Sequence, residues 1–257
     1  MPSAIYRQAR YYEIAFGFVD VVKHVDLLEA YISAYSLVPV TAVLEICCGP
    51  GRQAREFARR GYRAVGLDAS PYMLDYLCAR ANVEQVSVQT VQAEMMDFHL
   101  FPPAEFAYNL MGSIVYVTSS SALLAHLSSM ARVLQPGGLY LIENLPIDWS
   151  NPQSYAPQTW EMEEDNIRVR TTYQMQPVNP LEQSACHTLT LDVDDHGRVM
   201  QFTEEEVVRQ FYPEEFKTIV EMHGAFEFMG FFARERFERL TEISSDNYIL
   251  LRNKGME

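Results

Sequence analysis

The chain has 257 residues, a length typical of one large domain or of one domain with an elaboration. It carries 20 Lys and Arg against 34 Asp and Glu, a formal net charge of −14, and 48% of its residues are hydrophobic. This composition argues against wholesale disorder. It also argues against binding to a phosphate backbone as the main task, because such binding needs clustered Lys and Arg.

The sequence shows no sign of a membrane protein. No run of about 18 apolar residues occurs, as a membrane span would need, and Glu13 and Asp20 interrupt the N-terminal segment where a signal peptide would be apolar. The four cysteines are Cys47, Cys48, Cys78 and Cys186. They show no CxxC or Cys/His metal spacing, so we expect small buried thiols, no metal ion and a cytoplasmic location.

Strand and helix patterns alternate through the first half of the chain. Apolar positions at helical spacing predict one or two helices over residues 11–37, ended by Pro39. Short apolar runs then predict strands at residues 42–46, 62–67, 86–91, 106–111 and 139–143. Helical patterns between them cover residues 54–61, a segment that begins at Pro71, and residues 123–134, the last stopped by the Pro-Gly-Gly at 136–138. This alternation predicts an α/β fold, a Rossmann-like doubly wound sheet that binds ligands at the carboxyl ends of its strands.

The pattern changes after about residue 145. Residues 166–174 and 182–194 alternate in polarity, and the DDHG turn at 194–197 predicts antiparallel strands on both sides of it. A helix over 213–223 and two closing strands, 226–232 and 248–252, follow. We therefore expect an N-terminal helical cap (1–38), a Rossmann-like core (39–145 and 204–257) and an inserted antiparallel β substrate lid (146–203).

A glycine loop follows the first predicted strand. Residues 45–51 (EICCGPG) lie between a strand and a helix, where glycines let the backbone turn tightly and approach a ligand. Asp68 ends the next strand, where a carboxylate can take two ribose hydroxyls. The loop lacks the third glycine of GxGxxG, since Ala54 stands there, and Glu45 would be unfavourable beside a pyrophosphate. These residues favour a nucleoside ligand with a cationic group over a dinucleotide.

Four segments together resemble the class I S-adenosylmethionine-dependent methyltransferases. Residues 43–51 (VLEICCGPG) resemble that family's E/D-x-G-x-G-x-G cofactor loop, and residues 65–74 (VGLDASPYML) resemble its second signature. Residues 93–98 (AEMMDF) resemble the third signature, and residues 132–138 (RVLQPGG) the L-x-P-G-G turn before the fifth strand. The segments occur in the family's order, which makes them jointly specific.

The resemblance implies S-adenosylmethionine as cofactor, with S-adenosylhomocysteine as its product. Glu45 would hold the methionine ammonium side directly or through water, and Asp68 would take the ribose diol. Gly49 and Gly51 would let the backbone close on the methionine and ribose portions. The other implied contacts are Ala69, Met73, Glu94 and Met95 around the adenine, Leu110 and Met111 under the methionine portion, and Tyr12 as a cover.

Two positions depart from the family pattern. Cys47 stands where the family usually has glycine, so we expect a negative φ there and intact binding. Glu94 replaces the more common Asp and is one methylene longer. Glu94 could instead be an ordinary surface carboxylate, and Tyr12 could be a packing residue.

The second half resembles methyltransferases that act on glycine, amino sugars and similar small acceptors, and that carry a small antiparallel sheet over the active site. The candidate acceptor contacts are Tyr11, Tyr116, Asn144, Trp160, Arg168 and Tyr173. Glu143, at the expected end of the fifth strand, and His187 are the candidate catalytic residues. His187 shares a strand face with Leu189 and Leu191, so a hydrogen-bonded core histidine is the alternative.

These features predict an enzyme that moves a methyl group from S-adenosylmethionine to an N or O atom of a small molecule, as a monomer or homodimer without a nucleic-acid or membrane partner. One alternative is a non-catalytic S-adenosylmethionine or nucleoside-binding protein. Such a protein would keep Asp68 and Glu94, but the entrance to its site near Glu143 would be blocked. A nicotinamide-dependent oxidoreductase would need the missing dinucleotide glycines. A base methylator would carry an Asn-Pro-Pro-Tyr-type motif where residues 109–112 read NLMG.

Overall fold

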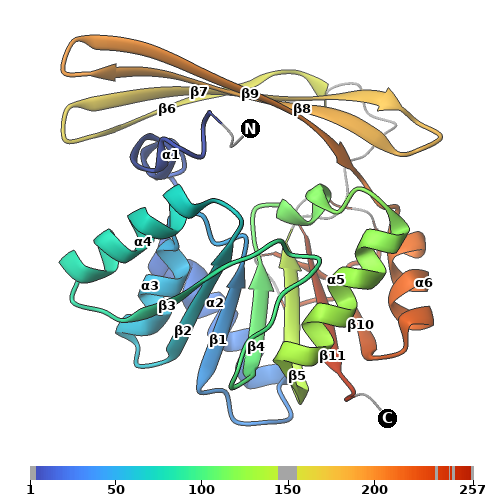
Figure 1. Ribbon diagram of the computed structural model, residues 1–257. Helices are drawn as coiled ribbons and strands as arrows, with labels where there is room; N and C mark the ends of the chain where they lie inside the picture. The colour runs from blue at the N-terminus through green and yellow to red at the C-terminus, as the bar shows by residue number, and fades with distance from the viewer. Residues whose placement is uncertain (1–3, 144–154, 235–236, 243, 245–246, 256–257) are drawn as a thin grey trace.

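Two β-sheets organise the part of the chain that the computed structural model describes, residues 4–143, 155–234, 237–242, 244 and 247–255. The first is seven-stranded, in the order β10-β11-β5-β4-β1-β2-β3, and the second is four-stranded, in the order β6-β7-β8-β9. Figure 1 shows the second sheet lying across one end of the first, with α1 (Ala9–Ala15) between them. The α/β doubly wound fold and the antiparallel insertion predicted from the sequence are both confirmed.

The first sheet is parallel except at one edge. Its strands are β1 (Ala42–Ile46), β2 (Arg63–Asp68), β3 (Val88–Gln92), β4 (Ala104–Asn109), β5 (Leu134–Glu143), β10 (Phe226–Ala233) and β11 (Asn247–Asn253). Strands β1 to β5 pair in parallel, whereas β11 runs antiparallel to both β5 and β10. The carboxyl ends of β1, β2, β4 and β5 therefore meet at one edge, where ligands bind in such sheets.

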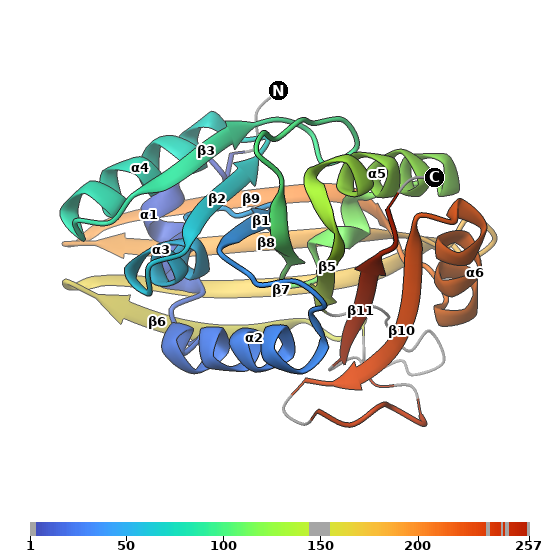
Figure 2. The same cartoon turned by 90° about the horizontal axis from the view of Figure 1, so that it is seen from below.

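Helices cover both faces of this sheet. They are α2 (Val21–Tyr35), α3 (Arg52–Arg59), α4 (Pro71–Val83), the short 3-10 helix η1 (Ser113–Tyr116), α5 (Ser120–Val133) and α6 (Pro213–His223). Leu127 of α5 and Phe216 of α6 pack in one core cluster with Ile46, while Leu28 of α2 and Phe57 of α3 pack in another. Figure 2 shows α2 and α3 on one side of the strands and α5 on the other. Burial on both faces explains why β1 and β4 are buried along their whole length.

The second sheet, which we call the lid sheet, consists of β6 (Gln158–Glu164), β7 (Ile167–Asn179), β8 (Ser184–Asp195) and β9 (Arg198–Arg209). Its inner face packs Val169 and Leu191 against Ile14 and Ala15 of α1. The predicted turn joins β8 to β9, with positive φ values of 54° at His196 and 86° at Gly197 that match the strand twist. β9 continues past residue 203, the expected end of the lid, because its pairing with β8 extends to Arg209.

The N-terminal helices do not act as one cap. Helix α1 turns its apolar side to the lid sheet, whereas α2 places Val25, Leu28 and Tyr31 in the core beneath β1 and β4. Figure 1 shows α1 well separated from α2 along the height of the molecule. The expected 1–38 cap is thus divided, since the two helices bury their apolar faces against different sheets.

Two predicted boundaries near β5 were wrong. Helix α5 ends at Val133 and β5 begins at Leu134, so the Pro-Gly-Gly at 136–138 lies within the strand and does not stop the helix. A Cβ at Gly138 would lie 2.5 Å from the Glu105 carbonyl oxygen, so glycine is needed for this close approach to β4. The fourth strand ends at Asn109, which leaves Leu110 and Met111 in the loop that follows.

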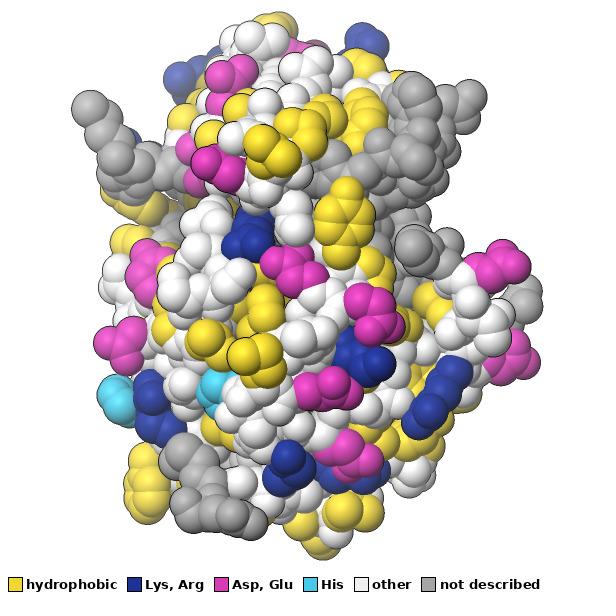
Figure 3. Space-filling view, turned by 90° about the vertical axis from the view of Figure 1, so that its right-hand side faces the viewer, with side chains coloured by type: hydrophobic (Ala, Val, Ile, Leu, Met, Phe, Trp, Pro, Cys, Tyr) yellow, Lys and Arg dark blue, Asp and Glu magenta, His cyan; other side chains and the backbone are white. Residues whose placement is uncertain are grey.

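The surface carries charges of both signs. Figure 3 shows a face on which Lys and Arg side chains are interspersed with Asp and Glu. None of the helices in the described part of the chain is both long enough and apolar enough to cross a membrane.

Candidate functional site

The glycine loop connects β1 to α3 at the carboxyl edge of the parallel sheet. Its backbone has positive φ at Gly49 (52°) and Gly51 (64°), a conformation that glycine adopts without steric penalty. A Cβ at Gly51 would meet the end of the Leu77 side chain of α4, which would have to shift, so the positive φ is the stronger reason for glycine there. At Gly49 the nearest atom to such a Cβ would be Tyr12 Cε1, at 3.8 Å, so this part of the loop faces Tyr12 of α1.

The backbone at Cys47 contradicts the sequence-based expectation. Its φ is +55°, not negative. The tight strand-to-helix turn dictates this conformation, and a non-glycine residue adopts it at a penalty of roughly 1–2 kcal/mol. Burial, followed by the Asp68 and Glu94 carboxylates, raises the pKa of the Cys47 thiol.

Asp68 joins the end of β2 to the glycine loop. Its Oδ2 accepts a hydrogen bond from the Gly49 backbone N–H at 2.8 Å, and its Oδ1 accepts one from the Ser70 N–H at 2.8 Å. Burial raises the pKa of Asp68, and the two amide hydrogen bonds oppose that rise. Each carboxylate oxygen has two acceptor positions, so both keep one for a further donor.

Glu45 is directed at the start of α3. Its Oε2 accepts from the Ala54 N–H at 2.9 Å and from the Tyr108 hydroxyl at 3.4 Å, and the residue is 4% exposed. Burial raises the pKa of this carboxyl group to about 8. Glu45 thus holds the first turn of the helix that follows the glycine loop, and contact with a ligand ammonium stays a prediction.

Tyr12 stands over the loop. Its ring packs against Phe16 and Tyr6, with centroids 4.6 Å and 5.9 Å away. Burial raises the pKa of Tyr12, with further electrostatic contributions from Asp68 and Cys47, so these groups lie in the same part of the molecule. The structure therefore brings Tyr12, Cys47, Gly49 and Asp68 together.

The remaining predicted cofactor contacts lie at the same edge of the sheet. Glu94 is exposed but close enough to Asp68 to influence its pKa, and Met73 is buried on α4. Ala69, directly after Asp68, is exposed. The Met95 carbonyl accepts a hydrogen bond from His126 Nδ1 at 2.8 Å, which holds the segment after β3.

Asn109 is a candidate that the sequence analysis missed. It ends β4, is fully buried, and its Nδ2 donates to the Ile46 carbonyl at 3.3 Å. Its Oδ1 has no hydrogen-bond partner among the described residues. A polar residue at the carboxyl end of a buried parallel strand was the available signal. An unsatisfied buried acceptor at this edge is a contact point for a ligand donor.

Glu143 is fully buried at the end of β5. Its Oε2 accepts from the Met111 N–H at 2.6 Å, and its Oε1 lies 2.9 Å from Arg234 Nε and 3.9 Å from His24 Nε2. Met111 itself has a positive φ of 54°. These contacts favour a role in holding the loop at Leu110 and Met111 over a role as a free base.

Several predicted acceptor residues meet beneath the lid sheet. The Tyr116 hydroxyl lies 3.4 Å from His187 Nδ1, and the Tyr173 and His187 ring centroids are 5.0 Å apart. Two residues that the sequence analysis missed join them: Tyr6, whose hydroxyl is 2.7 Å from that of Tyr116, and Glu206, directly opposite His187 in the strand register. Strand alternation could have placed Glu206 on the inner face, but the loop that carries Tyr6 could not be placed from sequence.

Other predicted acceptor residues have different partners. The Tyr11 hydroxyl donates to Asp195 at 2.7 Å, and Trp160 Nε1 donates to the Ala15 carbonyl at 2.7 Å. Arg168 is exposed and lies 3.5 Å from a carboxylate oxygen of each of Glu161 and Glu163, because it alternates with the inward-facing Val169. Asn144 lies outside the described residues.

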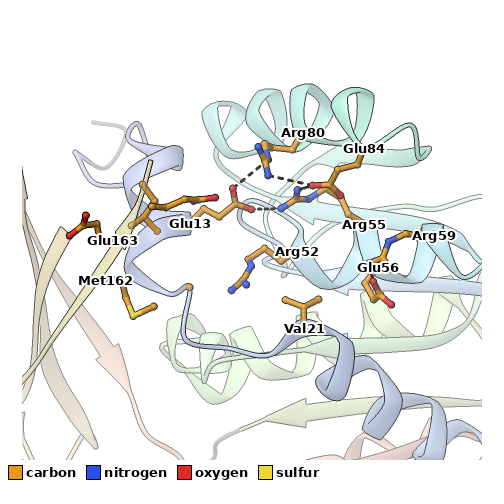
Figure 4. A pocket seen from close by; sticks show the side chains of 13 residues that line it. Glu13, Val21, Arg52, Arg55, Glu56, Arg59, Arg80, Glu84, Met162 and Glu163 are labelled. Atoms are coloured by element: carbon orange, nitrogen blue, oxygen red, sulfur yellow. Dashed lines mark hydrogen bonds and ion pairs between the residues drawn. The ribbon is translucent and has the colours of Figure 1, made fainter. Parts of the chain in front are cut away.

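A pocket of about 370 Å³ lies beside α1, lined by residues of α3, α4 and β6 (Figure 4). Arg55 makes ion pairs with Glu13 of α1 and with Glu84 at the end of α4, and Arg80 lies 3.6 Å from a carboxylate oxygen of each. The Tyr76 hydroxyl donates to Glu13 Oε2 at 2.6 Å. These paired charges tie α1 to the core, and the glycine loop does not line this pocket.

Comparisons of sequence agree with this geometry. Residues 43–138 match the sequence model of a family described as "Methyltransferase domain". An uncharacterised methyltransferase of Synechocystis is 32% identical over 118 residues, 44% of this chain and 52% of that protein. A dTDP-3-amino-3,4,6-trideoxy-alpha-D-glucopyranose N,N-dimethyltransferase of Streptomyces venezuelae is 27% identical over 116 residues, 45% of this chain and 46% of that protein. The chain spans about half the length of these curated relatives.

Solved structures share the whole arrangement. An S-adenosylmethionine-dependent methyltransferase from Clostridium acetobutylicum matches with a TM-score of 0.79 at 14% identity, over 95% of this chain and 96% of that one. DesVI of Streptomyces venezuelae matches with a TM-score of 0.73 at 18% identity, over 94% and 95%. The sugar N-methyltransferase KedS8 from Streptoalloteichus matches with a TM-score of 0.70 at 17% identity, over 93% and 89%. Residues 43–138 thus match a methyltransferase domain, and the chain as a whole shares the fold of these solved S-adenosylmethionine-dependent and sugar N-methyltransferases.

Proposed function

We propose that this protein is an enzyme that transfers a methyl group from S-adenosylmethionine to a nitrogen or oxygen atom of a small molecule. The observation that carries the proposal is the Asp68 carboxylate, which ends β2 and is bonded to the Gly49 N–H of the glycine loop beneath Tyr12. A carboxylate at this place in a doubly wound sheet is suited to a ribose diol.

The residues at the carboxyl edge fit this cofactor. The glycine loop lets the backbone approach a ligand, Asp68 keeps acceptor positions for hydroxyls, and the unpartnered Asn109 Oδ1 suits a donor such as an ammonium group. Leu110 and Met111 would lie under the methionine portion, with the Met111 N–H held by Glu143. When bound, S-adenosylmethionine supplies an electrophilic methyl group on a sulfonium.

The rest of the chain would position the acceptor and exclude water. Methyl transfer to an amine needs the nucleophile held in line with the methyl carbon more than it needs strong acid or base chemistry. Tyr12 of α1 lies over the glycine loop, and Tyr173 and His187 of the lid sheet meet Tyr116 of η1. Glu143 would act as a positioning residue.

Similar proteins support a small-molecule acceptor. A relative is named as an amino-sugar N,N-dimethyltransferase, and KedS8 as a sugar N-methyltransferase. The intermixed surface charges and the net charge of −14 favour such an acceptor over a nucleic acid. We further propose a cytoplasmic enzyme, since its cysteine pattern is typical of a reducing compartment.

Calorimetry with S-adenosylmethionine tests the cofactor site. Replacing Asp68 by Ala should weaken binding by about 1–3 kcal/mol, the scale of a lost hydrogen bond to a charged group. The matched control is Asp75→Ala, an exposed carboxylate on α4. Equal affinities for wild type and Asp68→Ala would contradict the site.

A methyl-transfer screen tests the reaction. Amino sugars, their nucleotide-linked forms, alkylamines, phenols and carboxylates would each be incubated with the protein and S-adenosylmethionine, and products read by a mass increase of one methylene. Tight cofactor binding without transfer to any acceptor would favour a non-catalytic binding protein.

A further inference from the structure

A chain of polar contacts links three parts of the molecule beneath the lid sheet. The Tyr116 hydroxyl, at the end of η1, lies 2.7 Å from the Tyr6 hydroxyl and 3.4 Å from His187 Nδ1. Tyr116 also lies close to Glu206, which stands opposite His187 in the register of β8 and β9. Opposite residues on one face of an antiparallel pair have Cβ atoms about 5 Å apart, so the two side chains are direct neighbours.

This chain reaches towards the glycine loop. Both Tyr12 and Cys47 lie close enough to Tyr116 to raise its pKa, together with the larger effect of burial. Tyr12 in turn borders Gly49 and Asp68. Tyr116 therefore stands between the proposed cofactor site and His187.

A neutral imidazole has two tautomers, and the contacts of His187 accommodate the one with its proton on Nδ1. In that tautomer the Nδ1–H donates to the Tyr116 oxygen, 3.4 Å away, and Nε2 keeps its lone pair. The Nε2 atom is buried without a hydrogen-bond partner in the described part of the chain. A buried, unsatisfied basic nitrogen requires an explanation.

Aromatic and acidic groups surround this nitrogen's ring. The Tyr173 ring of β7 and the Tyr116 ring of η1 lie 5.0 Å and 6.2 Å from the His187 ring, and Glu204 and Glu206 face it from β9. Burial lowers the pKa of His187, an effect that Glu204 opposes, so the ring is neutral near pH 7. Burial and then the Glu204 carboxylate raise the pKa of Glu206, and a cation beside the two carboxylates would relieve their repulsion.

We propose that the methyl acceptor is a cationic amine and that His187 Nε2 removes its proton before methyl transfer. Glu206 and Tyr116 are positioning residues beside this histidine, and the inference rests on the proposed function. The proton moves from the acceptor ammonium to Nε2, and the freed nitrogen lone pair forms the new N–CH3 bond. The electron pair of the broken S–CH3 bond stays on sulfur, which leaves as a neutral thioether.

Proton-transfer energetics favour an amine over an alcohol. An alkylammonium group such as that of lysine has a pKa of about 10.4, roughly four units above an ordinary imidazole. A hydroxyl group with the acidity of water lies roughly nine units above it. Proton transfer to a histidine is therefore far less unfavourable from an ammonium group than from a hydroxyl group.

The role of His187 is tested by the pH dependence of a single turnover, with 3-amino-3-deoxyglucose as the probe amine. In wild type the rate should level off above the His187 pKa. In His187→Asn it should fall at least about tenfold near pH 7 and keep rising with pH as the free amine forms. The control His196→Asn changes an exposed histidine in the β8–β9 turn and should retain the wild-type profile. Parallel profiles for wild type and His187→Asn, or no turnover of this amine by wild type, would overturn the proposal.

Acceptor charge is tested by binding of 3-amino-3-deoxyglucose and of glucose to protein saturated with S-adenosylhomocysteine. The amine should bind about tenfold more tightly than glucose, a preference that Glu206→Gln should abolish. Glu205→Gln is the matched control, because Glu205 is exposed on the outer face of the same strand. Equal binding of the two sugars to wild type overturns the inference alone, whereas failure of S-adenosylhomocysteine to bind overturns the proposed function.

Discussion

Cys47 shows how a single residue can conflict with the backbone it occupies. Its φ of +55° belongs to the left-handed region, which the turn after β1 requires and which glycine adopts most easily. The side chain contributes to stability because it packs against the core cluster that contains Ile46. Strain and packing are therefore balanced at this position.

Substitutions at Cys47 should separate these two effects. Cys47→Val should lower the free energy of unfolding by roughly 1–3 kcal/mol, because a β-branched side chain is poorly tolerated at positive φ. Cys47→Gly should change the free energy of unfolding by less than about 1 kcal/mol. The relief of backbone strain offsets the lost packing and the greater entropy of the unfolded chain. Urea denaturation measures both, with Cys186→Val on β8 as the control. A valine variant as stable as wild type would show that the turn is not strained.

Glu143 provides a second prediction for a single residue. Because its carboxylate holds the Met111 N–H and pairs with Arg234, Glu143→Gln should lower stability by about 1–3 kcal/mol and weaken cofactor binding. The pH profile of turnover should keep its shape. Thermal unfolding and the pH profile are measured together. Unchanged stability with loss of one limb of the profile would instead identify Glu143 as the base.

Among the helices, α1 is the element that joins the lid to the core. The Trp160 Nε1–H donates to its Ala15 carbonyl from the lid side, and Glu13 pairs with Arg55 on the core side (Figure 4). Tyr12 lies on the same helix, above the glycine loop. The position of Tyr12 over the cofactor site therefore depends on contacts at both sides of a seven-residue helix.

Breaking the core-side contact should loosen α1. Glu13→Gln removes the charge that faces Arg55 and Arg80, so the free energy of local opening should fall by about 1–3 kcal/mol. Hydrogen exchange of residues 9–15 should accelerate, and S-adenosylmethionine should dissociate faster. Glu163→Gln is the control, since Glu163 lines the same pocket but is 53% exposed and lies 3.5 Å from Arg168. Unchanged exchange in Glu13→Gln would exclude this anchoring role.

For the whole molecule, pH dependence of stability follows from groups buried between the layers. His126 is fully buried, with Nδ1 at 2.8 Å from the Met95 carbonyl and Nε2 at 2.8 Å from the Tyr140 hydroxyl. Burial lowers the pKa of His126 to about 4. Glu45 acts in the opposite sense, because burial raises its pKa to about 8. Its contribution to folding stability is present below its unfolded pKa and weakens as the pH rises from there towards 8.

The histidine contribution has a defined sign and range. An unfolded histidine has a pKa of about 6.5, so between about pH 6.5 and 4 the unfolded state binds more protons than the folded state. Wild type should lose on the order of 3 kcal/mol of stability across that range through His126. In His126→Gln this part of the pH dependence should disappear, whereas the exposed control His99→Gln should retain it. Urea denaturation at several pH values measures the difference, and identical slopes would contradict the assignment.

Local patterns were enough to predict the strand–helix alternation, the glycine loop, the position of Asp68 and the antiparallel insertion, because each depends on residues close together in the chain. Residues 42–46 and the helix at 213–223 were placed correctly for that reason. The sequence analysis did not predict the strand at Gln158–Glu164. Most of its residues are polar or charged, so the alternation of apolar and polar positions is hard to see.

Contacts between distant segments could not be read from those patterns. Glu143 meets Arg234, Tyr6 meets Tyr116, and Glu206 stands opposite His187, although none of these pairs shares a local motif. The φ of Cys47 likewise depends on how the loop is held between β1, α3 and Asp68. Periodicity reports which face of an element is buried, but the partner of a buried polar group is set by the packing of whole elements, and that packing assigns the roles within the site.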